Sequence, residues 1–443
     1  MARRKVGLVA IGGVRVHNQK LAEHGVSLPG FVDRGKVIAS LPSLAMLILA
    51  AVTPEDLEID LEYMEINECD TEGLGQIDSS DFQAVAISTY TAKVDVAYEV
   101  ADRFRERGVT VFFGGLHATL VGAEEPLEHA DAVALGEGEE LWPRMLRDWK
   151  DGKLQRVYRE EQPGTYDLAK TPVPRFDLLD LAAFNRITVQ TSRGCPHDCE
   201  FCGASKVFGP YRVKPVAQVI AELQEIKKHW ENPFIELADD NTFVNRRWSQ
   251  ELLEAMKPLG LHWFTETDIS LADNPEALKV LYDSGCRQVL IGLESTRAEG
   301  LKGIDARNWK LKQLDRYREA IERIQRSGVT VNGTFIVGLD SDTPDSFQEI
   351  VDFVRSSDLC EVQITVSTPF PGTRLFDRLK AEGRLLRDRF YEQCTLFDVT
   401  YEPKNMSVAE LEQGLLWMFD ELYNEKELQR RKRIYVDLVK DLL

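Results

Sequence analysis

The stretch Thr191-Ser-Arg-Gly-Cys-Pro-His-Asp-Cys-Glu-Phe-Cys202 decides how the rest of this chain is interpreted, because it places three cysteines within eight positions. Three residues separate Cys195 from Cys199, and two separate Cys199 from Cys202. Thiolates at such spacing on one tight loop can converge on a single soft metal centre. Three cysteines would leave one iron of a [4Fe–4S] cluster open to a small molecule that chelates through an amine and a carboxylate. S-adenosylmethionine (SAM) has both groups.

Two other interpretations of the cysteines are a zinc site that lacks its fourth ligand and a set of three unrelated thiols. Zinc sites usually pair their cysteines or histidines in two separated knuckles, and the sequence has no second knuckle. The spacing therefore favours the iron–sulfur cluster.

The motif Cys195-x3-Cys199-x-Phe201-Cys202, with an aromatic residue before the last cysteine, resembles the signature of the radical SAM superfamily. The resemblance implies that the three cysteines bind a [4Fe–4S] cluster, which gives an electron to SAM and produces a 5′-deoxyadenosyl radical. It also implies an external one-electron reductant of the flavodoxin or ferredoxin type. Phe201 is expected to pack over the cluster or the adenine, or else to belong to the core.

Composition limits the classes of function that remain. At 443 residues, two or three domains are expected. A net charge of −19 argues against nucleic acid as a partner, and the basic run 430–433 is expected to be a solvated helix end. No signal peptide and no apolar span are recognised in the sequence, so no membrane partner is expected. The other four cysteines are scattered, which favours a reducing cytoplasm without disulfides; they are Cys69, Cys286, Cys360 and Cys394. Oligomeric state is left open.

Residues 1–150 alternate short apolar strands with amphipathic helices, which predicts a parallel, doubly wound (Rossmann-like) α/β domain with ligands at the carboxyl ends of its strands. The expected helices cover 94–107 and 139–149. The expected strands are residues 6–11, 59–66, 84–88, 109–113 and 132–135.

These residues resemble the B12-binding domain of the same family, so cobalamin is an expected cofactor. Its candidate contacts, at the strand ends, are Ser88, Thr89, Gly114, Gly115, His117, Gly136 and Gly138, with His117 expected in a loop that lines the pocket. No Asp-x-His-x-x-Gly follows the first strand, and the loop 14–40 contains His17 and His24 instead. Cobalamin is therefore expected without a histidine below cobalt, although either of these histidines is an alternative ligand. The domain could also have lost its cofactor and serve as a lid or partner surface.

Residues 151–186 are predicted to be a proline-punctuated linker, and residues 187–382 a partial (β/α)6 barrel, open on one side. The cysteine segment follows the first barrel strand and so opens onto the catalytic face. The expected strands are 187–190, 234–237, 262–265, 288–291, 331–337 and 362–366. The expected helices between them are 215–230, 248–259, 275–284, 311–327 and 345–355.

Polar side chains at the barrel strand ends are the candidate SAM contacts. The resemblance implies that residues 238–241 correspond to the family segment that contacts the SAM amino group, which makes Asp239 and Asp240 candidates, although the segment has the sequence Ala-Asp-Asp-Asn and not Gly-Gly-Glu. Glu266 and Glu294 are candidates because carboxylates accept hydrogen bonds from ribose hydroxyls and ammonium groups. The alternative is that some of them cap the following helices.

Residues 383–443 are expected to be mostly helical, with Ser407 as the N-cap of a helix that runs towards Tyr423. Catalytic residues are unknown. Cys394 is a candidate cluster ligand or hydrogen-atom donor, although a lone cysteine is more often a core residue.

The leading hypothesis is a cobalamin-dependent radical SAM enzyme that transfers a methyl group to an unactivated carbon, or to phosphorus, of a small-molecule substrate. Two alternatives stay open. One is radical rearrangement, cyclisation or oxidation without methyl transfer, and the other is an iron–sulfur electron carrier or sensor. The substrate cannot be deduced, because pocket loops rather than the fold determine it.

Overall fold

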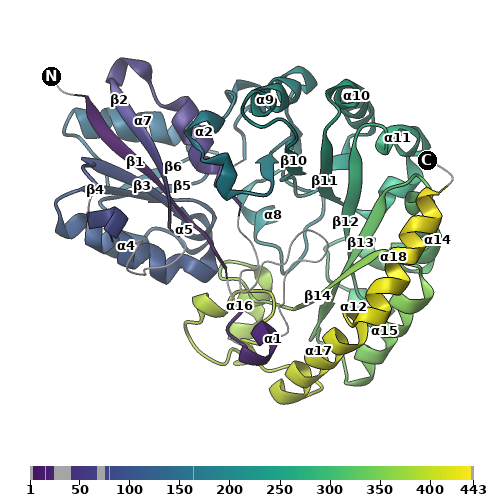
Figure 1. Cartoon of the computed structure of the whole chain (residues 1–443). Coiled ribbons are helices and arrows are strands. Elements are labelled where there is room, and N and C mark those ends of the chain that lie inside the picture. Colours follow the sequence, from purple (N-terminus) through teal and green to yellow (C-terminus); the bar gives the residue numbers. More distant parts are fainter. Residues whose placement is uncertain are drawn as a thin grey trace. The chain divides into compact units, whose positions relative to one another are not determined.

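The computed structural model describes residues 3–14, 16–23, 41–66, 75–78, 80–162 and 164–440, with the elements labelled in Figure 1. The chain divides into two compact units. The first comprises Met1–Val14, Ala39–Val189 and Gly203–Pro233, and the second comprises Arg15–Ile38, Gln190–Cys202 and Phe234–Leu443. Residues 203–233, which the sequence assigned to the barrel, pack with the first unit.

The first unit contains a six-stranded parallel sheet in the order β2-β1-β3-β4-β5-β6. Its strands are β1 (Arg4–Ile11), β2 (Ile59–Ile66), β3 (Ala84–Thr89), β4 (Thr110–Gly114), β5 (Ala132–Leu135) and β6 (Val157–Arg159). The five predicted strands are all present. The sixth, β6, lies in the predicted linker, so the sheet continues past residue 150.

Helices cover both faces of this sheet, as expected for a doubly wound domain (Figure 1). Alternate residues of β1, β3 and β4 pack with Met46 and Ala50 of α2 (Leu44–Val52) and with Trp142 of α7 (Gly138–Lys150). On the opposite face, Tyr98 of α4 (Val94–Glu106) contacts Phe113, with ring centroids 5.4 Å apart. The predicted helices at 94–107 and 139–149 are therefore confirmed.

The strands of the second unit pair in the order β14-β13-β12-β11-β10, all in parallel. They are β10 (Phe234–Leu237), β11 (His262–Thr267), β12 (Cys286–Glu294), β13 (Thr330–Val337) and β14 (Glu361–Val366). The predicted first barrel strand is also formed, as β7 (Ile187–Val189). The helices between strands are α10 (Arg246–Met256), α11 (Pro275–Leu281), α14 (Tyr317–Gln325) and α15 (Asp345–Ser356).

Three helices follow the last strand, namely α16 (Arg374–Ala381), α17 (Val408–Leu422) and α18 (Glu425–Val439). Ser407 caps α17 as predicted, because its hydroxyl accepts from the Glu410 backbone N–H while the Glu410 carboxylate accepts from the Ser407 N–H. The helical C-terminal segment is confirmed.

The remaining elements are short, apart from α9, which runs over residues predicted to be helical. They are α1 (Gln19–Glu23), α5 (Leu116–Val121), α6 (Pro126–His129), α8 (Ala204–Val207), α9 (Val216–His229), α12 (Ala298–Leu301), α13 (Trp309–Gln313), β8 (Ser192–Arg193) and β9 (Arg212–Val213). Within the described ranges, every helix is too short or too polar to cross a bilayer.

Candidate functional site

The three cysteines follow β7 and β8 in an irregular segment, with Cys199 buried and Cys195 and Cys202 half-buried. Burial raises the pKa of Cys195 to about 11 and raises that of Cys199, and each thiol lies near enough to the others to add to the effect. Among the described residues, no three His, Cys, Asp or Glu side chains converge on one metal ion. An iron–sulfur cluster does not need such convergence, because each thiolate binds a different iron.

Asp239, which follows β10, holds the backbone that leads into the cysteines. Its carboxylate is 3% exposed and accepts hydrogen bonds from the backbone N–H groups of Thr191 (2.6 Å) and Ser192 (2.8 Å). It also accepts from the hydroxyls of Thr191 and Thr242. The predicted role of Asp239 in binding SAM is not favoured by this placement, because its oxygens are already used by the chain itself.

Asp240 lies beside the first cysteine, where its carboxylate accepts from the backbone N–H of Gly194 at 2.9 Å. Burial raises the pKa of this carboxyl, and the neighbouring Asp239 carboxylate adds to the effect. Asp240 is half-buried, and one contact leaves its second oxygen available to a cationic ligand.

The sequence analysis missed three residues that together fix the cysteine segment, namely His197, Asn241 and Asp268. His197 lies between the cysteines, and its Nε2 is 3.0 Å from the Asp268 carboxylate, while its ring centroid is 4.2 Å from that of Trp309. Asn241 donates to Asp268 at 2.7 Å and lies 3.9 Å from the sulfur of Cys195. Although burial opposes ionisation, hydrogen bonds from His197, Ser270 and Asn241 lower the pKa of Asp268 to about 2.

Glu266 of β11 lies two residues before Asp268, and its side chain is reached by solvent. It still lies deep enough among protein atoms to lose hydration, which raises its pKa to about 8. The carboxylates of Glu236, Asp240, Glu294 and Asp239 raise it further. This concentration of acidic groups favours a cationic ligand.

Glu294 ends β12 in the left-handed region, with φ +65°. Its carboxylate accepts from the ammonium of Lys310 at 2.8 Å, and both side chains are more than nine-tenths buried. Burial opposes the charge on Lys310, but the Glu294 carboxylate and the nearby Cys199 thiol raise its pKa. The ion pair therefore holds the Lys310 ammonium group in a fixed position near the Cys199 thiol.

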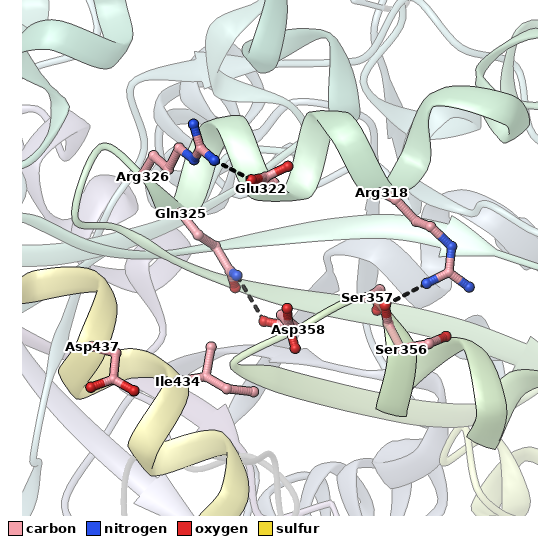
Figure 2. Close-up of a pocket in the computed structure, with 9 residues that line it drawn as sticks. All are labelled: Arg318, Glu322, Gln325, Arg326, Ser356, Ser357, Asp358, Ile434 and Asp437. Atoms are coloured by element: carbon pink, nitrogen blue, oxygen red, sulfur yellow. Dashed lines mark hydrogen bonds and ion pairs between the residues drawn. The ribbon is translucent and has the colours of Figure 1, made fainter.

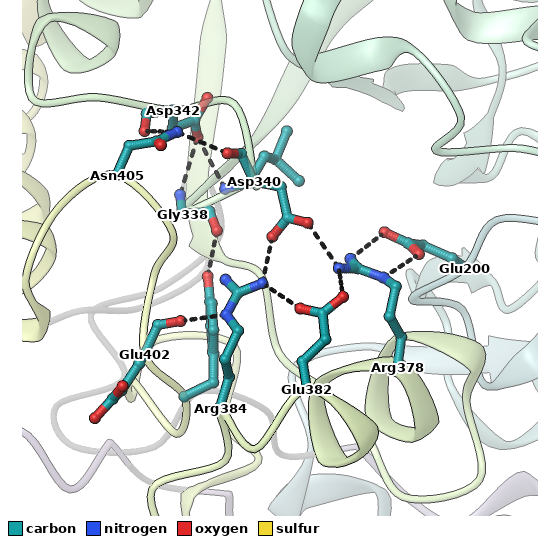
Figure 3. A network of polar contacts seen from close by, with 11 residues as sticks. Glu200, Gly338, Asp340, Asp342, Arg378, Glu382, Arg384, Glu402 and Asn405 are labelled. Carbon is teal, nitrogen blue, oxygen red and sulfur yellow. Dashed lines mark hydrogen bonds and ion pairs between the residues drawn. The ribbon is translucent and has the colours of Figure 1, made fainter.

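The helix α16 is attached to the cysteine segment by two arginines. Arg374 contacts the Asp198 carboxylate at 2.9 Å, and Arg378 donates twice to Glu200, at 3.0 and 3.2 Å. Figure 3 shows Arg378 between Glu200 and Asp340, with Arg384 on the other side of Asp340. This Glu200–Arg378–Asp340–Arg384 network joins the cysteine segment, the end of β13 and the C-terminal residues.

In the first unit, the candidate cobalamin contacts lie at one edge of the sheet, because β3, β4 and β5 run in parallel. Ser88 pairs with Gly114 in register. A Cβ on Gly115 (φ +95°) would lie 2.5 Å from the Ser88 hydroxyl, and one on Gly136 (φ +116°) would lie 2.5 Å from the Glu160 carboxyl carbon. At Gly138 it would lie 2.9 Å from Leu49. These glycines are therefore explained by packing within the chain.

Thr89 is buried beside them, and its hydroxyl donates to the Tyr90 carbonyl at 3.2 Å. The next residue, Tyr90, is 51% exposed at this edge. A large exposed ring beside small residues offers a flat apolar surface, which the sequence analysis did not single out.

The prediction that His117 lies in a loop that lines a pocket is wrong. His117 lies in α5, is fully buried and has its Nδ1 3.1 Å from the Thr91 hydroxyl. His17 donates its backbone N–H to Asp398, and His24 lies outside the described residues.

A buried ion pair links the strand-end motif 136–138 to the residues that follow the cysteines. The Glu137 side chain is 2% exposed and accepts from Arg212 at 3.0 Å through each of its oxygens. Arg212 also donates to the carbonyls of Tyr166 and Phe208 at 2.7 Å. Both residues belong to the first unit, so the pair stabilises that unit internally.

Cys394 is 4% exposed, and its thiol donates to the Phe390 carbonyl at 3.9 Å. Burial raises its pKa, which favours a core residue over a ligand or a hydrogen-atom donor. Phe201 is half-buried. A surface pocket shown in Figure 2 contains none of the predicted site residues; it is lined by Arg318, Glu322, Gln325, Arg326, Ser356, Ser357, Asp358, Ile434 and Asp437.

Three family models match the chain. The model of the radical SAM superfamily matches residues 189–354, and that of the B12 binding domain matches residues 32–146. A domain of unknown function, DUF4070, matches residues 373–441.

Characterised relatives match over most of the chain. Bacteriochlorophyllide d C-8(2)-methyltransferase of Chlorobaculum tepidum is 26% identical over 88% of this chain and 87% of its own length. Hopanoid C-3 methylase of Methylococcus capsulatus is 30% identical over 77% of this chain and 68% of its own length. The fold is shared with the radical SAM methyltransferase TsrM of Kitasatospora setae, solved with cobalamin and a [4Fe–4S] cluster, at a TM-score of 0.70 and 14% identity, covering 95% of this chain and 89% of that one.

Proposed function

Because this chain belongs to the radical SAM superfamily and has an N-terminal B12-binding domain, we propose that it transfers a methyl group to an unactivated carbon of a small molecule. The observation that carries the proposal is the presence, in one chain, of the three-cysteine segment and a B12-binding sheet. Relatives that match this chain over most of its length are named as a methyltransferase and a methylase.

Three thiols within one segment fit a [4Fe–4S] cluster with an open iron, and the segment is held from three sides. Asp239 fixes the entering backbone, Asp268 fixes His197, and Arg378 fixes Glu200. When bound, the cluster and SAM supply a carbon-centred radical, and cobalamin supplies a carrier for the methyl group. The role of the chain is to hold these groups in a fixed arrangement.

The residues near the cysteines have charges that complement the two ends of SAM. Asp240 has an oxygen available for the ammonium group, and Lys310 has one N–H beyond its contacts with Glu294 and Gly292 that would bind the carboxylate. Glu266 would accept from the ribose hydroxyls or from the substrate. Glu294 would not contact SAM directly; it would hold the Lys310 ammonium group in position.

Cobalamin would lie at the carboxyl edge of the first sheet, over the small residues that end β3, β4 and β5. The exposed ring of Tyr90 would pack against the macrocycle. His117 is buried in α5 and would not serve as a cobalt ligand, which fits the absence of the Asp-x-His-x-x-Gly motif.

Electron supply requires a partner, and we include in the proposal a one-electron donor of the flavodoxin or ferredoxin type. In the assays below, dithionite would replace this protein donor as the reductant.

The test is to incubate the reconstituted enzyme with SAM that carries a deuterated methyl group, a reductant and hydroxocobalamin. The proposal predicts S-adenosylhomocysteine and transfer of the label into the cobalamin fraction, even before a substrate is known. Formation of 5′-deoxyadenosine alone, with the label retained on methionine, would contradict methyl transfer.

That contradictory result would favour a second candidate. The chain also matches the anaerobic magnesium-protoporphyrin IX monomethyl ester cyclase of Cereibacter sphaeroides, at 24% identity over 71% of this chain and 55% of that protein. A radical cyclisation or oxidation would give 5′-deoxyadenosine without S-adenosylhomocysteine.

A further inference from the structure

Three consecutive residues that follow β10 contact successive points of the cysteine segment. Asp239 and Asp240 accept hydrogen bonds from the backbone that leads into the first cysteine. The next residue, Asn241, contacts that cysteine itself, because its Nδ2 lies 3.9 Å from the Cys195 sulfur. The first two contacts hold backbone, whereas the third is made to a side chain that would bind iron.

The orientation of the Asn241 amide is fixed by its neighbours. Its Oδ1 accepts from the Thr267 hydroxyl at 3.1 Å and from the backbone N–H of Asp268 at 3.3 Å. Its Nδ2 donates to the Asp268 carboxylate at 2.7 Å. A backbone N–H can only donate and a carboxylate can only accept, so the two ends of the amide cannot be exchanged. The amide nitrogen has two N–H groups, and the second one is directed to the Cys195 sulfur.

The partner that holds Asn241 is itself held in place. Asp268 also accepts from the backbone N–H and the hydroxyl of Ser270, and its carboxylate is 3.0 Å from His197 Nε2. Asn241 is 3% exposed, and a hydrogen bond in such a buried place is electrostatically stronger than it is in water. The surrounding chain therefore keeps the Asn241 N–H group directed towards the sulfur.

A hydrogen bond to a cysteine sulfur acts on an iron–sulfur cluster through the charge of the cluster. Reduction takes one electron from the external donor and makes the thiolate ligands more negative. An N–H group that donates to one of these sulfurs therefore stabilises the reduced state more than the oxidised state. Hydrogen bonds to the sulfurs are among the factors that set the reduction potential of such clusters.

We propose that Asn241 donates an N–H···S hydrogen bond to the Cys195 thiolate and thereby raises the reduction potential of the cluster. Asn241 then serves the cluster, whereas Asp240 remains the candidate contact of the SAM ammonium group. The inference rests on the proposed function only in that the three cysteines bind the cluster, and it does not depend on methyl transfer.

The experiment is a redox titration of the anaerobically reconstituted enzyme with titanium(III) citrate, without SAM or cobalamin, in which EPR spectroscopy quantifies the reduced cluster. Asn241→Leu has a side chain of similar size without N–H groups. Loss of the hydrogen bond should shift the reduction equilibrium by about three- to tenfold towards the oxidised state, which corresponds to a potential about 30–60 mV lower. An unchanged potential in Asn241→Leu with full iron content would overturn the proposal.

Two further variants separate the hydrogen bond from a general effect on the fold. Thr267→Val removes one contact at the oxygen end of the same amide, keeps the N–H groups and should leave the potential unchanged. The exchange of Asn241→Asp with Asp268→Asn keeps a hydrogen bond between the two side chains but places a carboxylate oxygen beside the sulfur. Its potential should fall at least as far as that of Asn241→Leu. Equal shifts in Thr267→Val and Asn241→Leu would indicate a purely structural role and overturn the proposal.

A measurement on the unsubstituted chain decides the case in which Asn241→Leu does not bind the cluster. The enzyme is labelled with ¹⁵N at its asparagine side chains and reduced, and pulsed EPR spectroscopy detects magnetic coupling between the cluster and nitrogen. The proposal predicts a ¹⁵N coupling, and its absence would overturn the proposal. S-adenosylhomocysteine formation by the same preparation reports separately on the proposed methyl transfer, because the potential and the coupling are measured without SAM.

Discussion

Arg378 of α16 holds Glu200, the residue that follows the second cysteine, through two hydrogen bonds of 3.0 and 3.2 Å. The same guanidinium reaches Asp340, after β13, at 2.7 Å. A planar, two-pronged contact fixes orientation as well as distance. The C-terminal segment, which matches a domain of unknown function, therefore helps to position the cysteine segment.

Replacement of Arg378 tests this relationship. Arg378→Met should leave Glu200 and Asp340 without their shared cation, and we expect about tenfold slower SAM cleavage and faster loss of cluster absorbance in air. Arg378→Lys keeps the positive charge but not the planar guanidinium group. Its rate of SAM cleavage and its cluster lifetime should therefore lie between those of the wild type and those of Arg378→Met. The control is Arg387→Met, since the Arg387 side chain is 65% exposed. Wild-type cluster lifetime in Arg378→Met would rule out the positioning role.

The four hydrogen bonds to Asp239 predict a second effect on the cysteine segment. Asp239→Ala would leave the buried N–H groups of Thr191 and Ser192 without their acceptor and should lower the stability of the second unit by about 2–5 kcal/mol. Iron content after reconstitution should fall together with this stability. The exposed Asp283 gives a matched control. If Asp239→Ala kept full iron content but raised the KM for SAM, the original expectation of a SAM contact would be correct.

The Glu137–Arg212 pair predicts an effect confined to the first unit. Glu137→Ala leaves a largely buried guanidinium unpaired and should destabilise that unit by about 3–5 kcal/mol. Hydrogen–deuterium exchange of α7 at increasing urea concentration measures the change within the first unit. By contrast, Arg147→Met removes an exposed pair with Asp56 and should cost less than about 1 kcal/mol. Equal effects of the two variants would contradict the burial argument.

Glu266 predicts a dependence of stability on pH. Its pKa is raised from 4.5 to about 8, mainly by loss of hydration among the surrounding protein atoms and further by the neighbouring carboxylates, so the folded state binds its proton more tightly than the unfolded state. The resulting stabilisation is complete below pH 4.5 and is lost as the pH rises towards 8 and above. Glu266→Gln should remove this decline, and thermal unfolding midpoints between pH 5 and 9 would show it. A variant with the same decline as the wild type would mean that another group titrates.

Strong local patterns made the fold predictable. Continuous apolar runs identified β1, β3, β4 and β5, and the Ser407 cap identified α17. The linker prediction failed at β6 because Val157–Arg159 is short and lies between polar residues, so only its pairing with β5 defines it as a strand.

The candidate site was predictable in position but not in role. A carboxylate after a parallel strand can bind a ligand or hold a neighbouring loop, and sequence does not separate Asp239, which holds Thr191 and Ser192, from Asp240. His117 follows two glycines, which indicated a loop, yet tertiary packing places it in a short helix. His197 could have been suspected from its place between two cysteines, but its partner Asp268 lies 71 residues away in sequence.

Metal analysis of one preparation tests the central claim most directly. The protein would be reconstituted without oxygen with iron, sulfide and hydroxocobalamin, desalted, and analysed beside a variant with Cys195, Cys199 and Cys202 all changed to alanine. The account predicts about four irons and four sulfides with about one cobalt per chain, and loss of iron but not of cobalt in the variant. Iron without cobalt would contradict methyl transfer through cobalamin, and iron retained by the variant would contradict the whole assignment.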